Sequence, residues 1–365
     1  MNTVLVTSTG ESTGKTAITL ALGLLAKERG LDVGYMKPKG TRLQSSTGKT
    51  LDEDPMLARE LLDIDAEMHQ LEPVVYSPTF IQGAIRGKEN NKELSEVISH
   101  HFDDLSVDKD LMLVEGGGSY RTGGIVDLTD ADIASLFDAK VLLVAEYGHP
   151  SDLDDLVAAV EDIGADRLVG VVFNRVGDSV YDELETEVAP FLDARGVPVL
   201  GVVPTEKDLA GVTVQELADE LGADLATDAP TDAFVERFLV GAMGGDAALR
   251  YFRRTKDAAV ITGGDRANIQ RAALEAPGVK CLILTGGHRP VGAVIGKAEE
   301  KGVPVLLVNG DTLSVTDRAE DIVSTGRTRD ERTVERMRDL LFEHADVDAL
   351  IGGIEPSGDA GNDDE

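Results

Sequence analysis

The chain has 365 residues, 42% of them hydrophobic, and carries 67 acidic against 35 basic residues, a formal net charge of −32. This length suffices for two domains, each with its own core. The negative surplus repels nucleic acid and anionic membranes, so we expect neither as a partner. No apolar run approaches the roughly 20 residues that span a bilayer, and the N-terminus lacks a signal-peptide pattern. We therefore expect a cytoplasmic protein.

The acidic residues are spread along both halves of the chain, in addition to an acidic C-terminal tail. An even distribution suits a salty cytoplasm, where counterions screen the repulsion between surface charges. We expect a halophilic, haloarchaeal source, with an ordinary acidic protein as the alternative. The single cysteine, Cys281, lies in the apolar run VKCLILTGG. It excludes a disulfide framework and a cysteine zinc site, and we expect a buried thiol.

The first part of the chain alternates short apolar runs with helical patterns. Val4–Val6 is an expected strand and Ala17–Lys27 an expected helix. Continuous β-branched runs predict strands buried on both faces, and helices between them imply a parallel sheet with right-handed crossovers. The segment Val212–Ala226 either closes this block or links it to the next. Further strands are expected at Val33–Met36, Leu111–Val114, Val141–Ala145, Leu168–Phe173 and Val199–Val202.

A second series of alternating strand and helix patterns follows, and we place the boundary between the two domains near Gly211. The expected organisation is a domain over 1–210, a smaller α/β domain over 211–327, and residues 328–365 as a terminal helix (Thr333–Phe342) with an acidic disordered tail. In the second domain, strands are expected at Phe238–Ala242, Ala258–Ile261, Lys280–Leu284 and Pro304–Val308, and helices at Ala267–Leu274, Val291–Lys301 and Thr316–Ile322.

The pentapeptide STGKT occurs twice, at Ser12–Thr16 and at Ser46–Thr50. The first copy follows a strand and opens a helix, the geometry in which backbone N–H groups and the helix N-terminus bind phosphate. Lys15 is expected to reach the β and γ oxygens, and Thr16 to hold Mg²⁺. Thr9 replaces the first glycine of the usual pattern, and a plain glycine turn is the alternative. The expected nucleotide contacts are Gly10, Glu11, Ser12, Thr13, Gly14, Lys15, Thr16 and Ala17.

The second copy lies in KGTRLQSSTGKTLDEDP, without a strand immediately before it or an apolar helix immediately after it. We interpret this copy as a polar loop rather than a second phosphate site.

The order of motifs after the first copy resembles the dethiobiotin synthetase group of P-loop proteins, over roughly residues 1–211. In YMKPKG, the resemblance gives Lys37 a role at phosphate or substrate beside Lys15, against a solvated lysine as the alternative. In LDEDP it gives Asp54 a metal role, with Asp52 as a competitor. In LMLVEGGGSY it makes Glu115 a second metal ligand, against a simple cap. Asn174 in VVFNRV and Pro204 in GVVP correspond to segments that contact adenine.

From about Gly211 to Thr325 the sequence resembles the DRTGG domain, in segments such as AAVITGGDRANIQRAAL and CLILTGGHRPVGAV. Glycine pairs at strand ends suit contact with an anion or nucleotide through backbone N–H groups. Tight turns without a ligand are the alternative. The expected site residues are Gly263, Gly264, Asp265, Arg266, Thr285, Gly286, Gly287 and Arg289, to which Asp311 could be added.

A parallel-sheet, P-loop NTPase-like α/β domain followed by a DRTGG domain resembles the N-terminal regulatory part of long phosphate acetyltransferases. Those enzymes carry a further catalytic domain, and only residues 328–365 follow here. The resemblance thus implies a regulatory part standing alone, not an acetyltransferase. We expect an ATP- and Mg²⁺-binding sensor that forms a homodimer and binds a small metabolite, with a phosphate acetyltransferase or a related enzyme as a candidate partner. An ATP-dependent ligase or amidating enzyme is the alternative, and a scaffold without nucleotide is disfavoured.

Overall fold

The computed structural model describes residues 1–40, 43–46, 49–52, 54–206, 211–326 and 331–351. The chain forms two compact units. The first contains Met1–Thr205 together with the C-terminal segment from Thr328, and the second contains Glu206–Arg327. The expected terminal helix is therefore part of the first unit, and the second unit is an insertion between two segments of the first.

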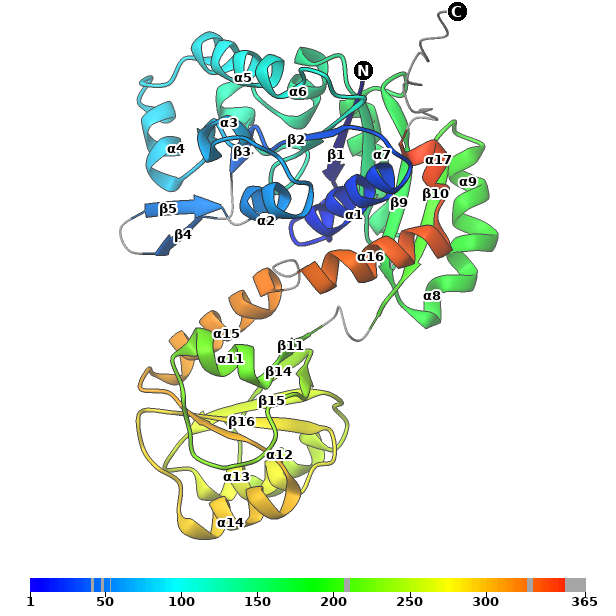
Figure 1. Cartoon of the computed structure of the whole chain (residues 1–365). Coiled ribbons are helices and arrows are strands. Elements are labelled where there is room, and N and C mark those ends of the chain that lie inside the picture. The colour runs from blue at the N-terminus through cyan, green and yellow to red at the C-terminus, as the bar shows by residue number, and fades with distance from the viewer. Residues whose placement is uncertain (41–42, 47–48, 53, 207–210, 327–330, 352–365) are drawn as a thin grey trace, which may run out of the picture. The chain divides into compact units, whose positions relative to one another are not determined.

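The first unit is built on a six-stranded sheet whose strands all run parallel, as the sequence predicted. Every residue of the strand 111–115 is buried, and so is every residue of the strand 33–36. Helices cover both faces of the sheet (Figure 1), which explains why these strands are continuously apolar. In sheet order the strands are β10 (Val199–Pro204), β9 (Leu168–Val176), β8 (Lys140–Ala145), β1 (Asn2–Ser8), β7 (Leu111–Glu115) and β2 (Val33–Met36).

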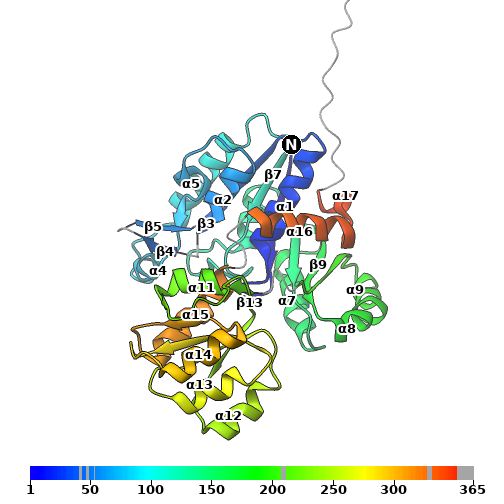
Figure 2. The ribbon, with the colours of Figure 1, turned by 60° about the horizontal axis from the view of Figure 1, so that its bottom comes forward.

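The first helix, α1 (Lys15–Glu28), is apolar around most of its circumference because it contacts several layers at once. One side packs on the sheet, and α16 (Glu331–His344) packs against it from the other end of the chain. Figure 1 and Figure 2 show the two helices side by side. The other helices of the unit are α2 (Asp54–Leu61), α3 (Met68–Leu71), α4 (Pro78–Ile85), α5 (Asn91–Leu105), α6 (Asp130–Leu136), α7 (Asp152–Ile163), α8 (Asp178–Glu183), α9 (Ala189–Asp193) and α17 (Val347–Leu350), with single turns at Gly124–Val126 and Leu184–Val188.

Two small strand pairs accompany this sheet. β3 (Lys39–Gly40) pairs in parallel with β6 (Val74–Val75). β4 (Leu43–Ser46) and β5 (Lys49–Asp52) form an antiparallel hairpin, and Ser46 pairs with Lys49. The second STGKT copy therefore belongs to a hairpin instead of the polar loop that we expected, with residues 47 and 48 outside the described part. It does not precede a helix.

The second unit contains a five-stranded sheet in which four strands are parallel and the edge strand β12 is antiparallel. The sheet order is β12 (Asp224–Leu225), β17 (Val305–Leu307), β16 (Val279–Thr285), β15 (Ala258–Gly263) and β14 (Arg237–Val240), and β11 (Val212–Thr213) pairs separately with β13 (Phe234–Val235). The helices are α11 (Val214–Leu221), α12 (Gly245–Phe252), α13 (Ala267–Leu274), α14 (Gly292–Lys301) and α15 (Thr312–Gly326).

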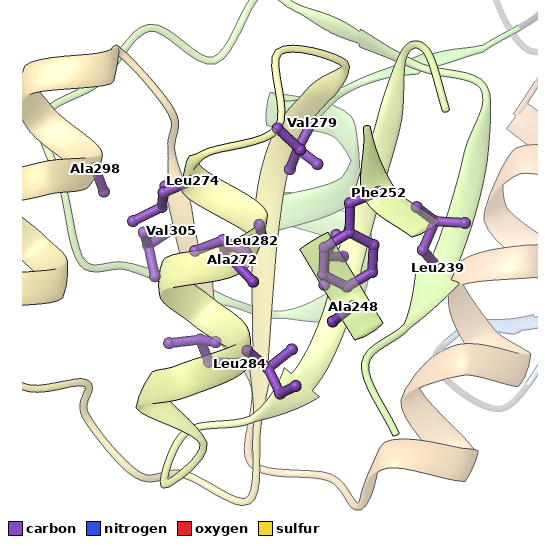
Figure 3. Close-up of a cluster of buried hydrophobic side chains, with 14 of the residues drawn as sticks. Leu239, Ala248, Phe252, Ala272, Leu274, Val279, Leu282, Leu284, Ala298 and Val305 are labelled. Carbon is purple, nitrogen blue, oxygen red and sulfur yellow. The ribbon is translucent and has the colours of Figure 1, made fainter. Parts of the chain in front are cut away.

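Alternate residues of β16 enter two separate cores, one on each face of the sheet. Leu282 and Leu284 pack with Phe252 and its neighbours (Figure 3), while Cys281 and Ile283 pack on the other face. Cys281 is fully buried, as predicted, and burial raises the pKa of its thiol. This alternation follows from the two-residue period of a strand. In the described part of the chain, no helix is long and apolar enough to cross a membrane.

Candidate functional site

The first STGKT copy forms the loop between β1 and α1. Gly14 adopts a left-handed φ of 90° and ends the loop, and Ser12 is also left-handed at 56°. Lys15 begins the helix and is only 7% exposed. Its ammonium donates to Ser8 Oγ and to the carbonyl oxygen of Gly118, each at 3.0 Å. The lysine therefore lies along the loop, where it can meet an anion held by the loop's N–H groups.

The end of β9 braces this loop. The amide of Asn174, 1% exposed, donates to the carbonyl oxygen of Thr13 at 2.8 Å. Gly14 is required there, because a Cβ at this position would lie 2.3 Å from Asn174 Nδ2. Arg175 donates to the carbonyl oxygen of Ser12 and to Glu146, the latter at 3.1 Å. In the structure the amide of Asn174 supports the phosphate loop, and its predicted contact with adenine stays a prediction.

Pro204, the other predicted base contact, ends β10 at the edge of the sheet. Two strands, β9 and β8, separate β10 from β1. Its contact with a base stays a prediction, because among the described residues no hydrogen bond links Pro204 to the loop.

The three predicted metal-binding residues converge. Thr16 Oγ1 lies 2.7 Å from Glu115 Oε1 and 3.1 Å from Asp54 Oδ2, and all three residues are at most 6% exposed. One hydroxyl and two carboxylate oxygens at such distances suit Mg²⁺, which takes few protein oxygens and completes its shell with water and phosphate. Among the described residues, no three acidic, histidine or cysteine side chains form a metal site by themselves. A Mg²⁺ site at this place therefore includes the Thr16 hydroxyl in addition to the carboxylates of Asp54 and Glu115.

Lys37 joins the same cluster, and its role at phosphate or substrate, implied by the family resemblance, stays a prediction. Its ammonium lies 2.5 Å from Asp54, 2.7 Å from Asp52 and 3.5 Å from Glu115, and it is 2% exposed. Burial alone would lower the pKa of Lys37, but the three carboxylates outweigh it and the pKa is raised. Lys37 is therefore a permanent cation. Asp52, the competitor for the metal role, contacts Lys37 and accepts from the backbone N–H of Asp54 at 3.1 Å.

The second oxygen of Glu115 accepts a hydrogen bond from the Tyr35 hydroxyl at 2.8 Å. Burial raises the pKa of Glu115, and Lys37 opposes this rise. Burial and the charge of Glu115 raise the pKa of Tyr35, so the phenol stays a donor. These partners fix the orientation of the Glu115 carboxylate at the tip of β7.

Sequence reasoning missed a third buried lysine. Lys39 donates to Asp130 at 3.0 Å and to the carbonyl oxygens of Thr122 and Leu128 at 2.7 and 2.5 Å. Asp130 also accepts from Thr7 at 2.6 Å and from the N–H of Gly117 at 3.1 Å. This network anchors the glycine-rich segment that follows Glu115. No local pattern signalled the burial of Lys39, because Lys37 follows the end of β2 and Lys39 begins β3, so the two lysines do not alternate along one strand.

Sequence reasoning also missed Glu72, which is 8% exposed. Burial, with Asp52 next in importance, raises the pKa of Glu72 to about 8, and Lys37 opposes the rise. A glutamate directly before a proline, as in Glu72-Pro73, is typical of an exposed turn. The sequence therefore contains no indication that Glu72 is buried.

In the second unit, the predicted ligand residues lie at the ends of β15 and β16. The N–H groups of Gly264, Gly286 and Gly287 donate to backbone carbonyl oxygens of Thr285, Gly310 and Val308, respectively, at 3.1, 2.9 and 3.2 Å. The glycine amides thus connect loops to one another, where the sequence had predicted contact with an anion.

Two charged residues near the ends of β15 and β16 make hydrogen bonds within the second unit. Arg266 donates to the carbonyl oxygen of Gly241 at 2.8 Å. Asp311 caps α15 by accepting from the N–H groups of Leu313 and Ser314 at 3.0 and 3.1 Å. Asp265 and Arg289 are exposed, which leaves their binding role a prediction.

Comparison with known proteins agrees with this architecture. A family model described as an AAA domain matches residues 2–213, and one described as a DRTGG domain matches residues 216–322. A phosphate acetyltransferase of Haemophilus influenzae is 23% identical over 95% of this chain and 52% of its own length. A cobyric acid synthase of Clostridium perfringens is 26% identical over 58% of this chain and 49% of its own length.

Among solved structures, the MinD cell division protein of Aquifex aeolicus is 17% identical with a TM-score of 0.36, covering 57% of this chain and 84% of that chain. The chain spans about half the length of the curated relatives it matches. Its N-terminal match covers more than half of its residues. The chain therefore belongs to the AAA-domain family of that model, with a DRTGG domain following, and is homologous to the N-terminal region of phosphate acetyltransferases.

Proposed function

We propose that this chain is an ATP- and Mg²⁺-binding regulatory or sensor protein, related to the N-terminal part of phosphate acetyltransferases. One observation carries the proposal: the Thr16 hydroxyl touches both Asp54 and Glu115 at the start of a helix whose first residue is Lys15. Homology to phosphate acetyltransferases over 95% of the chain supports the choice of protein class.

In this proposal, the loop N–H groups and the N-terminus of α1 bind the phosphates. Lys15 neutralises charge on the β and γ oxygens. Thr16, Asp54 and Glu115 would hold Mg²⁺, which, when bound, offsets phosphate charge. Lys37 stays fixed among carboxylates and orients Asp54 and Glu115.

The second unit would bind a metabolite or nucleotide at the ends of β15 and β16, near Asp265 and Arg289. Coupling would require each ligand to favour one state of the protein, and it would act reciprocally on both affinities. A phosphate acetyltransferase is the proposed partner, and a homodimer the proposed assembly.

Titration calorimetry in molar potassium chloride tests nucleotide binding. Wild type should give magnesium-dependent heat with ATP, and Lys15→Ala should lower the affinity at least 100-fold, because an ionic hydrogen bond to phosphate is lost. Lys27→Ala is a matched control, since Lys27 lies on the same helix as Lys15 and pairs with Asp63, an exposed residue outside that helix. Binding by Lys15→Ala equal to that of wild type would refute the proposal.

An ATP-dependent ligase or amidating enzyme is the second candidate. Lys37 favours it, because a lysine buried among three carboxylates beside the phosphate site could orient an acceptor for γ-phosphate transfer. Similarity to cobyric acid synthases supports it. Phosphate release measured with a panel of carboxylic acids decides between them: a sensor shows negligible turnover throughout, whereas a ligase accelerates with one acid and stops in Lys37→Met.

A further inference from the structure

Glu72 lies between α3 and β6, beside the carboxylate cluster. The carbonyl oxygen of Leu71 accepts from the N–H of Lys37 at 2.8 Å, so the backbone before Glu72 is hydrogen-bonded to that lysine. The side chain packs against Gly40, where a Cβ would lie 1.8 Å from Glu72 Oε1. A glycine at that position therefore leaves the space that the carboxyl group occupies.

Glu72 differs from its neighbours in having no partner. The residue is 92% buried, given its 8% exposure, and no hydrogen bond or ion pair of its side chain is found with any described residue. By contrast, Asp52, Asp54 and Glu115 all contact Lys37. Burying a carboxyl group without a hydrogen-bond donor costs free energy, and such a group calls for an explanation, of which a bound ion is one.

The charges of the cluster indicate the kind of ligand. Its described carboxyl groups belong to Asp52, Asp54, Glu72 and Glu115, and its only described ammonium group to Lys37. A divalent ion at Thr16, Asp54 and Glu115 would bring two further positive charges. Once Glu72 is ionised, one negative charge remains in the cluster, and Glu72 is the carboxyl group that has no hydrogen-bond or ion-pair partner among the described residues. One additional positive charge would neutralise the cluster.

We propose that Glu72 anchors a subsite for one compact monovalent cation beside the phosphate site. The occupant is either the protonated amine of a bound metabolite or an alkali metal ion, since both satisfy a buried carboxylate. This inference deepens the proposed function by naming the group that binds next to the nucleotide, and it rests on that function for the charge of the metal.

The subsite is tested by calorimetric melting of wild type and Glu72→Gln in magnesium chloride without nucleotide. Chloride salts of ammonium, methylammonium, potassium and choline are compared at one ionic strength. Relative to choline, which is too large for a buried site, compact cations should raise the Tm of wild type by about 3–5 °C at ten times the dissociation constant. Glu72→Gln should lose this rise, and Glu60→Gln, at an exposed glutamate, should keep it.

The pattern among salts identifies the source. A rise with ammonium and methylammonium but not potassium indicates an amine, and a rise with potassium and ammonium but not methylammonium indicates an alkali metal site. If the Tm of wild type and that of Glu72→Gln respond equally to every salt, the proposal is overturned. Because both proteins are compared in the same salts, general salt effects cancel.

A second variant guards against misfolding of the first. Gly40→Ala keeps the charge but displaces the carboxyl group, and it should also abolish the preference for compact cations. Nucleotide affinity is measured separately. If wild type does not bind nucleotide but shows a cation response that depends on Glu72, the proposed function alone is refuted. If wild type binds nucleotide but shows no cation response that depends on Glu72, the subsite alone is refuted.

Discussion

Asn174 shows how one side chain determines the shape of the phosphate loop. Its amide donates to the carbonyl oxygen of Thr13 and occupies the space beside Gly14. Arg175 adds a second connection, to Ser12, and both Ser12 and Arg175 have left-handed backbones. Such strained conformations persist only where surrounding contacts hold them. The loop is therefore shaped before any phosphate arrives.

This arrangement predicts the behaviour of Asn174→Ala. Losing the brace should weaken ATP, GTP and inorganic triphosphate by the same factor, about tenfold, because a buried hydrogen bond of roughly 1–1.5 kcal/mol is lost from the loop that binds all three. Calorimetric titration of the three ligands measures it. A loss confined to ATP would instead show that Asn174 reads the base.

Glu72 predicts a pH dependence of stability. Burial raises its pKa from an ordinary value of 4.5 to about 8. Between these values the folded protein retains a proton that the unfolded chain has released, so this group's contribution to stability falls as the pH rises through that window. Urea unfolding in choline chloride from pH 5 to 8 should show a steeper decline for wild type than for Glu72→Gln. Parallel curves would contradict the prediction.

At the scale of elements, α16 completes the first unit from the far end of the chain. Leu340 and Leu341 are at most 1% exposed, and the helix packs on α1. Ala345 forms a bridge with Gly201 of β10, and Asp346 donates its N–H to the carbonyl oxygen of Leu200 at 2.7 Å. These contacts cover one edge strand of the sheet.

Leu341→Ala should therefore destabilise the first unit by about 2–5 kcal/mol, since a buried leucine leaves a cavity. Phe342→Ala is the matched control on the same helix: Phe342 is 71% exposed, and its loss should cost at most about 0.5 kcal/mol. Urea unfolding measures both. Similar effects of the two substitutions would show that α16 does not contribute to the core.

The sequence predicted the long elements well, and the structure shows why. The apolar strand runs gave every strand of the large sheet, and Ala267–Leu274 matches α13 at both ends. The short strands β3 and β6 were not predicted. β3 contains the buried Lys39, whose burial depends on Asp130, a residue distant in sequence. Strand order and the packing of α16 on α1 escaped for the same reason, since local patterns do not encode distant partners.

Predicted site residues lie close together where a motif coincided with the end of a strand. Thr16, Asp54 and Glu115 converge, and Lys37 joins them. Asn174 lies at the phosphate loop, where its amide donates to Thr13, and its contact with a base stays a prediction. The sequence could not reveal Glu72, because its burial depends on the space left by Gly40 and on the approach of α3 to Lys37.

At the scale of the whole molecule, the net charge of −32 makes stability dependent on salt. Raising potassium chloride from 0.1 to 1 M shortens the screening length from about 10 to about 3 Å, which reduces repulsion between surface carboxylates. We expect the Tm to rise steadily over this range, as measured by calorimetry. A variant with several exposed acidic residues replaced by Gln or Asn should respond less. A Tm that falls with salt would contradict a halophilic adaptation.

The second unit leaves the first after β10 and returns to it at α16. While Glu206–Arg327 is folded, the chain between these two points is already shortened into a compact body. If the second unit unfolded, α16 could stay packed on α1 only if an unfolded loop of more than a hundred residues were closed. Closing such a loop has an entropic cost on the order of 4 kcal/mol. Damage to the second unit would therefore destabilise the docking of α16 in the first unit through chain connectivity alone.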